Sequence, residues 1–230
     1  MQNQRRALKT YGGRNGRKLS SRQLRLIKTL LPKVEIKLDP SRPFDPLHQF
    51  TPRSEMWLEI GFGGGEHVSG QAGKNPDIGL LASEVFAEGI AKLLGQIEAD
   101  DLQNIRIWPK DGRDLVAGLQ RHSIDRAFIL FPDPWPKSKH HKRRLIQPQF
   151  LNALARVMKP GGRVRFATDV RSYADQALER FLAHPAYHWT AKRADDWQSP
   201  PSDHIQTRYE AKELGDIRPV FYDFDINESN

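Results

Sequence analysis

Acidic side chains close the apolar runs of this sequence one after another. Each acid lies at the carboxyl end of a segment that reads as a strand, and the set is Glu59, Glu84, Asp111, Asp133 and Asp169. The carboxyl ends of parallel strands meet at one edge of a sheet, where open α/β sheets bind their ligands. Helix capping explains any one of these acids but explains the set poorly, because gathered carboxylates are costly without a cation or hydrogen-bond donors. The pattern indicates a site for a cationic, donor-rich ligand.

Prolines occupy every second position within Phe131–Lys137, which reads Phe-Pro-Asp-Pro-Trp-Pro-Lys. They exclude a helix and remove backbone donors, so a stiff, extended loop should leave the strand that ends at Leu130. The loop carries Asp133 and Trp135, and residues 137–144 add five lysine and arginine side chains without any acid. These groups suit an anionic partner that carries bases. A proline-rich connector with a solvated basic turn is the alternative, and Trp135 either stacks on a base or packs under the loop.

A glycine-rich loop follows the first expected strand, Met56–Gly61. Glycines at this place, above all Gly61 and Gly63, let the backbone approach a bound ligand before a helix begins. Glu66 stands where a dinucleotide-binding Gly-x-Gly-x-x-Gly pattern has its last glycine. Such a loop is weak evidence by itself. Glu59, two residues before the first glycine, is its distinguishing feature.

Strands and helices alternate around these residues. Seven strands are expected, at Met56–Gly61, Ile78–Ser83, Ile105–Trp108, Ile124–Leu130, Val164–Thr168, Tyr187–Ala191 and Val220–Phe224. Helices are expected around 90–97, over 147–158 and around 173–182, and a short one opens at Thr207. The last two strands have little helix between them. This order predicts an α/β fold with a doubly wound, mostly parallel seven-stranded sheet and one antiparallel strand at or near an edge.

The net charge of +8 is unevenly distributed. Residues 1–37 hold eleven lysine and arginine residues against Glu35 alone, so they carry +10 and the remaining 193 residues sum to −2. A basic arm on a near-neutral body is typical of proteins that bind nucleic acid, with a solubilising tail as the alternative. Residues 1–54 are predicted to form a largely mobile arm that includes a helix from Ser20 to Leu31. The main domain is expected to span residues 55–230.

Several classes of protein are disfavoured by the composition. The chain has no cysteine, which excludes disulfides and thiolate-bound metals and favours the cytoplasm. The polar start and the lack of a long apolar run predict neither a signal peptide nor a membrane span. His140 and His141 are assigned to the basic run, since no further metal ligands accompany them, and no metal site is expected. Nothing points to an obligate protein partner, and monomer and homodimer both stay open.

From about Glu55 onward the chain resembles the bacterial tRNA (guanine-N7-)-methyltransferases. The segments that carry the resemblance are Leu58–Gly63, Phe131–Lys137 with the basic run behind it, Lys159–Gly162 and Thr207–Glu210. The proline loop and the Thr-Arg-Tyr-Glu turn are its most specific parts. Phe86 and Gly112 differ from the histidine and alanine that are frequent in the family.

The resemblance implies a class I methyltransferase (Rossmann-like) fold that uses S-adenosylmethionine to methylate N7 of the variable-loop guanine, position 46, of tRNA. It implies Asp133 as the catalytic carboxylate. The implied cofactor contacts are Glu59, Gly61, Gly63, Glu84, Asp111 and Asp133. The implied contacts to the substrate nucleotide are Lys137, Asp169, Thr207, Arg208, Tyr209 and Glu210. The implied RNA contacts are Lys139, His140, His141, Lys142, Arg143 and Arg144.

Three alternatives are weighed against this interpretation. Transfer to an exocyclic amino group is one, because Pro-Asp-Pro-Trp is similar to the Asp/Asn-Pro-Pro-aromatic loop of amino methyltransferases, although Asp133 here separates two prolines. An RNA-binding module with a vestigial pocket is the second, and the intact acids Glu59, Glu84, Asp111 and Asp133 speak against it. A nicotinamide oxidoreductase is the third, and Glu66 counts against it.

Overall fold

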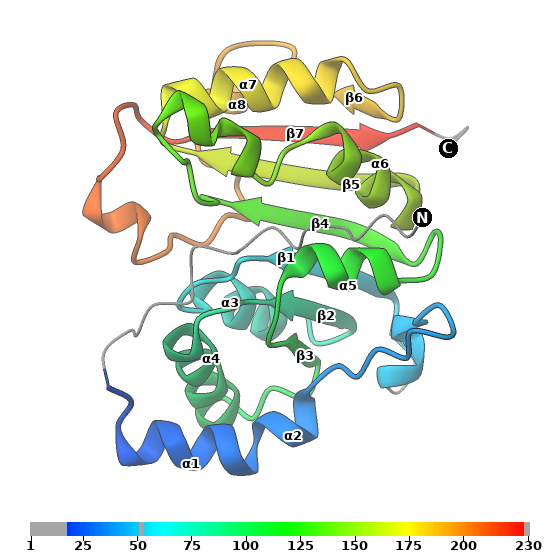
Figure 1. Ribbon diagram of the computed structural model, residues 1–230, viewed down its shortest axis with the longest axis vertical. Helices are drawn as coiled ribbons and strands as arrows, with labels where there is room; N and C mark the ends of the chain where they lie inside the picture. Colours follow the sequence, from blue (N-terminus) through cyan, green and yellow to red (C-terminus); the bar gives the residue numbers. More distant parts are fainter. Residues whose placement is uncertain (1–17, 51–52, 228–230) are drawn as a thin grey trace, which may run out of the picture.

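One seven-stranded sheet organises the computed structural model, which describes residues 18–50 and 53–227 (Figure 1). The strands are β1 (Glu55–Ile60), β2 (Ile78–Ser83), β3 (Ile105–Trp108), β4 (Ile124–Leu130), β5 (Met158–Thr168), β6 (Tyr187–Trp189) and β7 (Val220–Ile226). Their order is β3-β2-β1-β4-β5-β7-β6, and β7 runs antiparallel to both of its neighbours while the other pairs are parallel. The predicted mostly parallel sheet with one antiparallel strand near an edge is confirmed.

Helices pack on both faces of the sheet, each with its own apolar cluster. One face is covered by α5 (Gly112–Gly118), α6 (Pro148–Val157) and α7 (Arg171–Leu182). The other face is covered by α3 (Glu66–Lys74) and α4 (Ala87–Ala99). The helices after β1 and β4 therefore lie on opposite faces, although these strands are neighbours. The carboxyl ends of two such strands are where doubly wound sheets bind ligands.

The described part of the expected N-terminal arm packs on this domain. Helix α1 (Ser21–Thr29) begins with a capping box at Ser20, and its buried Leu26 faces α4. Helix α2 (Leu31–Val34) follows directly, so Pro32 lies in the first turn of a second helix instead of ending the first. Pro fits there because a first-turn N–H has no helical partner. The boundary at residue 54 stays a prediction, and residues 1–17 lie outside the described part of the chain.

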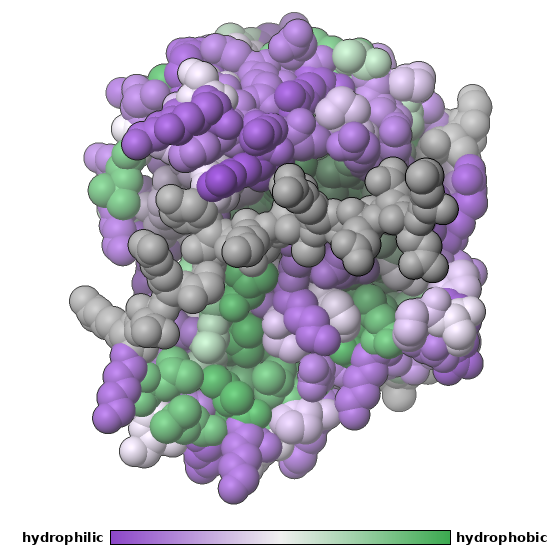
Figure 2. Space-filling view, in the orientation of Figure 1, coloured by the Kyte–Doolittle hydropathy of each residue, from purple (hydrophilic) through white to green (hydrophobic). Residues whose placement is uncertain are grey.

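The remaining elements are short. They are the 3-10 helices η1 (Pro46–Gln49), η2 (Ser138–Arg143) and η3 (Glu210–Lys212) and the one-turn helix α8 (Asp195–Gln198). On the face shown in Figure 2, polar side chains cover the upper half, and apolar ones gather at the lower left over α1 and α4. Within residues 18–50 and 53–227, no helix is long and apolar enough to cross a membrane.

Strand β5 begins earlier than expected. The helix expected over 147–158 is α6, which ends at Val157, just before the Lys-Pro-Gly-Gly stretch. The strand nevertheless starts at Met158, which pairs with Ile124 before the register shifts. Gly161 absorbs this irregularity with a backbone φ of 74°, a left-handed value that glycine adopts without strain.

Candidate active site

The glycine loop after β1 presents open backbone. Gly61 and Gly63 have φ values of 75° and 56°, so other residues would be strained at these positions. A Cβ atom built on either glycine would meet no atom within 4 Å. The loop therefore exposes its main chain to a space that a ligand can occupy, as the sequence predicts.

Glu84 ties this loop to the end of β2. Its Oε2 accepts the N–H of Gly63 at 2.8 Å, and its Oε1 accepts those of Val85 and Phe86 at 2.7 and 3.0 Å. Burial raises the pKa of the Glu84 carboxyl, and these three hydrogen bonds oppose the shift. The side chain is thus fixed before any ligand arrives.

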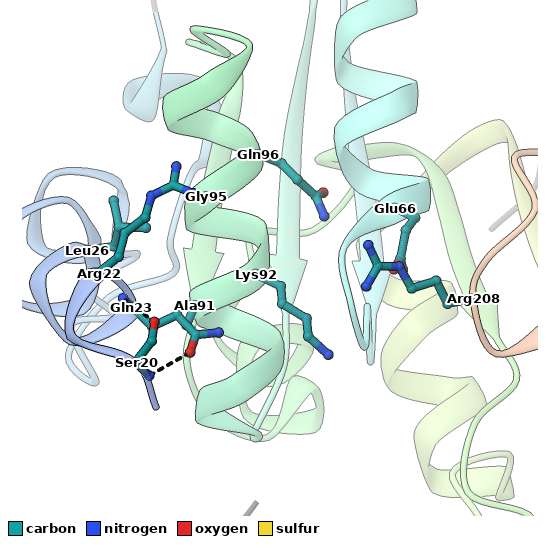
Figure 3. A pocket seen from close by; sticks show the side chains of 10 residues that line it. All are labelled: Ser20, Arg22, Gln23, Leu26, Glu66, Ala91, Lys92, Gly95, Gln96 and Arg208. Atoms are coloured by element: carbon teal, nitrogen blue, oxygen red, sulfur yellow. Dashed lines mark hydrogen bonds and ion pairs between the residues drawn. The ribbon is translucent and has the colours of Figure 1, made fainter. Parts of the chain in front are cut away.

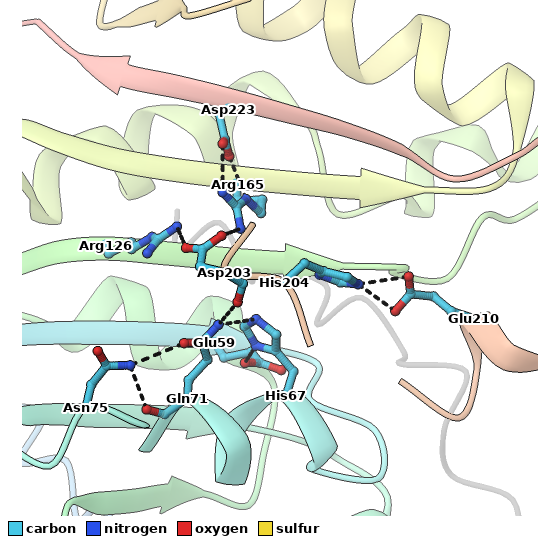
Figure 4. A network of polar contacts seen from close by, with 10 residues as sticks. All are labelled: Glu59, His67, Gln71, Asn75, Arg126, Arg165, Asp203, His204, Glu210 and Asp223. Carbon is cyan, nitrogen blue, oxygen red and sulfur yellow. Dashed lines mark hydrogen bonds and ion pairs between the residues drawn. The ribbon is translucent and has the colours of Figure 1, made fainter. Parts of the chain in front are cut away.

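Glu59 is held by a histidine that the sequence analysis missed. Its carboxylate is 2% exposed and accepts the Nδ1–H of His67 at 2.6 Å. The other ring nitrogen of His67 accepts from Gln71 Nε2 at 3.2 Å, which keeps the proton on Nδ1 (Figure 4). The polar part of the buried face of α3 was a usable signal, because His67 and Gln71 lie one helical turn apart on it.

Asp111 is a helix cap as well as a predicted cofactor contact. It precedes α5, and its carboxylate accepts the backbone N–H of Arg113 at 3.0 Å and the side-chain N–H groups of the same residue. Burial would raise the pKa of Asp111, but the Arg113 hydrogen bonds outweigh it and lower the pKa. The capping role that the sequence left open is present here.

The proline loop bends sharply at two positions. Phe131 and Trp135 have φ values of 51° and 45°, which side-chain-bearing residues rarely adopt. Between these bends lies Asp133, which is exposed, although crowding by the loop desolvates its carboxyl and raises its pKa. Trp135 packs against the basic run, with the Arg143 guanidinium 4.8 Å from its ring centroid and His140 at 5.8 Å. Trp135 thus contacts η2 within the chain, and its stacking on a base stays a prediction.

The basic run forms η2, and its members differ in exposure. Lys137, Lys139 and Lys142 are exposed, and His140 and His141 are half-buried. Desolvation and the surrounding cations lower the pKa of His140. The run therefore presents a cationic surface next to Asp133.

Arg144 does not belong to that surface, which corrects the prediction that it contacts RNA. Its side chain is 1% exposed. All three guanidinium nitrogens donate to groups of the protein itself. It therefore cannot reach a phosphate in this conformation.

The Thr207–Glu210 turn meets the proline loop through its tyrosine. The Tyr209 ring lies 5.5 Å from that of Phe131, and its hydroxyl donates to Asp169 Oδ1 at 3.4 Å. Burial first, then the negative charges of Asp169 and Asp133, raise the pKa of Tyr209. Asp169 and Tyr209 are thus in contact, and Asp133 lies close enough for its charge to act on the Tyr209 hydroxyl. Their role on the substrate side stays a prediction.

Glu210 and Arg208 in this turn are occupied by partners within the chain. The buried Glu210 carboxylate accepts the Nε2–H of His204 at 2.9 Å and the backbone N–H of Thr207 at 2.9 Å. Burial opposes ionisation, but these contacts lower the pKa of Glu210. Arg208 pairs with Glu66, the first residue of α3, at 3.1 Å.

A polar network under the sheet fastens the segment before this turn (Figure 4). Asp203 pairs with the buried Arg165 and with Arg126, and Arg165 also pairs with Asp223. The backbone oxygen of Asp203 accepts from Gln71 at 2.8 Å. This network was not predicted from the sequence, because its members come from β4, β5, β7 and a loop and share no local pattern.

A polar cleft of about 420 Å³ is lined by residues of α1, α4, the start of α3 and the Thr207–Glu210 turn (Figure 3). Its lining includes Arg22, Lys92 and Gln96, and the Glu66–Arg208 pair lies on its opposite side. Gln96 donates to the oxygen of Gly64, so the cleft adjoins the glycine loop. None of the five predicted strand-end acids lines it.

Comparisons with known proteins agree with this geometry. A family model described as "Putative methyltransferase" matches residues 53–221. A tRNA (guanine-N(7)-)-methyltransferase from Hyphomonas neptunium is 51% identical over 95% of this chain and 100% of that protein. One from Caulobacter sp. is 48% identical over 94% of each.

Solved structures share the fold at low sequence identity. An rRNA methylase from Streptococcus thermophilus has a TM-score of 0.54 at 13% identity, covering 80% of this chain and 93% of that one. The aminoglycoside resistance methyltransferase NpmB1 has a TM-score of 0.53 at 16% identity, covering 76% and 89%. At such identities the likeness extends to the fold alone.

Proposed function

We propose, since this chain belongs to the tRNA (guanine-N(7)-)-methyltransferase family, that it transfers a methyl group from S-adenosylmethionine to N7 of the guanine at position 46, in the variable loop of tRNA. The observation that carries the proposal is the meeting of exposed Asp133 with Asp169 and Tyr209 at the carboxyl edge of the sheet, beside an open glycine loop. The proposal includes a cytoplasmic location, which the cysteine-free composition favours.

The residues at this edge fit S-adenosylmethionine, which supplies a methyl group on a positively charged sulfur. A carboxylate has about four acceptor positions, and Glu84 uses three of them for backbone N–H groups. One position thus remains for a ribose hydroxyl. Glu59, buried behind the loop, places negative charge near the methionine end, and Gly61 and Gly63 leave room for close approach. Asp111 is the proposed contact to the adenine.

Asp133 serves the acceptor base in this proposal. Guanine N7 carries a lone pair and no proton, so its attack needs no general base. Alignment of N7 with the methyl carbon is the main requirement, and such positioning is worth roughly 7–11 kcal/mol in favourable systems. A carboxylate at position 133 accepts from the N–H edge of guanine and complements the positive charge that moves onto the purine. Asp169 and the Thr207–Glu210 turn shape the other side of the base.

The lysines beside the proline loop provide the RNA contact. Lys137, Lys139 and Lys142 are exposed on one side of Asp133 and suit the phosphates that flank the target nucleotide. Arg208 pairs with Glu66 in the free protein, and a phosphate at the turn would compete for it. Counterion release predicts binding that weakens steeply with salt.

Methyl incorporation tests the proposal. Pure protein is incubated with S-adenosylmethionine labelled in the methyl group and an unmodified tRNA transcript, and the labelled nucleotide is then mapped. Label should appear at guanine 46 and be lost in a transcript with adenine at that position. Label at another nucleotide would refute the position. Calorimetry without RNA separates an RNA-binding module from an enzyme, since a vestigial pocket would not bind S-adenosylmethionine.

A further inference from the structure

Arg144 is a buried arginine inside a basic, solvent-facing run. Its neighbour two positions back, Lys142, is exposed. Arg144 itself is among the largest fully buried side chains of the described residues. Arg144 belongs to the basic run by sequence but is buried in the fold. Its role therefore differs from that of the exposed lysines in the run.

The guanidinium of Arg144 connects two elements of the acceptor site. Its Nε donates to the carbonyl oxygen of Pro134 at 2.7 Å. Its Nη1 donates to the Ser172 carbonyl at 2.7 Å and to Gln176 Oε1 at 2.6 Å, and its Nη2 donates to Ser172 Oγ at 2.8 Å. Nη2 also donates to His141 Nε2 at 3.0 Å. A planar fork of donors makes these contacts together, and a lysine ammonium cannot reproduce them.

The two connected elements carry predicted site acids. Pro134 directly follows Asp133, and Ser172 lies in the first turn of α7, which begins shortly after Asp169. The guanidinium therefore spans from the backbone next to one carboxylate to the helix next to the other. It also lies over the ring of the buried Tyr173, 4.8 Å from the centroid.

The charge on Arg144 has no ion-pair partner in the part of the chain that the structure describes; its acceptors there are carbonyls, a hydroxyl, an amide and an imidazole. An ion pair with an acidic side chain therefore does not explain the position of Arg144. The loop it holds is strained at Phe131 and Trp135, whose φ values are positive. Strained backbone persists only where the surrounding structure holds it, and the bond to Pro134 lies between these two residues.

We propose that Arg144 is a positioning residue for methyl transfer, holding the backbone at Pro134 against the start of α7 so that the Asp133 carboxylate is aimed at the acceptor base. This inference rests on the proposed function for its kinetic consequence. The contact with Pro134 itself does not depend on that function.

Arg144→Lys tests the role, because it keeps the charge and removes the fork. Turnover at saturating tRNA should fall by about 10²-fold, the cost of a displacement of about 1 Å in an aligned site. The dissociation constant for tRNA and its salt dependence should stay within two-fold of wild type. Arg163→Lys is the control, since Arg163 lies in the middle of β5, is half-exposed and pairs with Asp225 on β7. That change should leave both quantities unaltered.

Chemical rescue and hydrogen exchange separate positioning from general damage. Arg144→Ala should regain part of its turnover when guanidinium is added at millimolar concentration. The turnover of the control Arg163→Ala should not change when guanidinium is added. Amides of Phe131, Asp133 and Trp135 should exchange faster in Arg144→Lys than in wild type without any RNA.

Full turnover with a reduced salt slope in Arg144→Lys would overturn the inference and return Arg144 to the RNA contacts. Unchanged exchange in the loop would also overturn it. A wild-type protein that transfers no methyl group to tRNA would refute the proposed function instead, and the exchange measurement would still decide whether Arg144 holds the loop.

Discussion

The two sides of the candidate site are built differently. The donor side consists of the Gly61–Gly65 loop with Glu59 and Glu84, and the acceptor side consists of loop 131–144 with the Thr207–Glu210 turn. On the donor side, Glu84 is held by backbone N–H groups of its own loop and of the adjoining one. On the acceptor side, the turn is held by side chains, above all by His204 on Glu210.

The two sides should therefore differ in how they tolerate amino-acid substitutions. Backbone donors cannot be lost by substitution of a neighbour, so the position of Glu84 depends mainly on its own carboxylate. Glu59 on the same side also needs the side chain of His67. Side-chain pairs on the acceptor side are each removable, and a buried charge left without its partner is costly. We therefore expect the two sides to respond to separate substitutions in separate measurements.

Asp133→Ala should have the largest effect. Loss of the carboxylate should lower turnover by at least about 10²–10³-fold, the range seen when one electrostatic group is removed from a transition-state site. Affinity for S-adenosylmethionine, measured by calorimetry, should stay within a few-fold. Asp175→Ala, on exposed α7 surface, is the control. Unchanged turnover would remove Asp133 from the chemistry and end the contrast between the two sides.

Glu84→Gln should affect the donor side alone. The amide nitrogen of glutamine replaces one acceptor oxygen of Glu84. At least one backbone N–H of Gly63, Val85 or Phe86 then faces a donor and loses its hydrogen bond. An unsatisfied buried N–H costs about 1–3 kcal/mol. Calorimetry should show affinity for S-adenosylmethionine reduced by about 10-fold or more, which is about 1.4 kcal/mol, with tRNA affinity unaltered. Glu88→Gln on α4 is the control. Equal cofactor affinity in the two variants would contradict a donor role for Glu84.

Lys139→Ala combined with Lys142→Ala should flatten the salt dependence of tRNA binding. Each lost phosphate contact lowers the slope of log affinity against log salt by about 0.7–0.9. In the double variant the slope of log affinity against log salt should therefore be smaller in magnitude by about 1.4–1.8. Filter binding over a salt series measures this slope. A matched pair of exposed lysines away from the site, Lys74 and Lys192, provides the control. An unaltered slope would move the RNA contact to another surface.

Two Asp→Asn changes should shift thermal stability in opposite directions. Burial raises the pKa of Asp169, so its ionised form costs stability as pH rises through that pKa. Asp169→Asn should therefore raise Tm at pH 7 by a few degrees, about 2–4 °C per kcal/mol, and match wild type below about pH 4. Arg113 lowers the pKa of Asp111, which stabilises the fold above the ordinary aspartate pKa. Asp111→Asn should therefore lower Tm at pH 7. If both variants changed Tm in the same direction, the opposite pKa shifts of Asp169 and Asp111 would be contradicted.

The sequence predicted the donor side more completely than the acceptor side. Strands β2, β3 and β4 have the predicted bounds, because continuous apolar runs between turn residues leave little choice. Because Glu84 and Asp111 follow the ends of parallel strands, their position at the carboxyl edge of the sheet could be predicted from the topology. The acid pattern did not reveal that Glu59 is paired, although the polar face of α3 could have shown it.

The missed features depend on contacts between distant segments. His204 and Asp203 looked like part of a polar loop. The partners of Asp203, Arg126 and Arg165, come from strands 77 and 38 residues before it, and His204 pairs with Glu210. Arg144 looked like one more cation, because composition does not show which side chain of a basic run turns inward. Local pattern specifies elements, but the pairing of charges across elements needs the fold itself.

Chemical cleavage of methylated tRNA tests the central claim most directly. N7-methylguanine is labile to borohydride and aniline, and a base methylated on an exocyclic amino group is not. Transcript methylated by this protein should break at position 46 after that treatment, in proportion to the methyl groups incorporated. Label that is incorporated but leaves the strand intact would contradict transfer to N7 and would favour an amino methyltransferase.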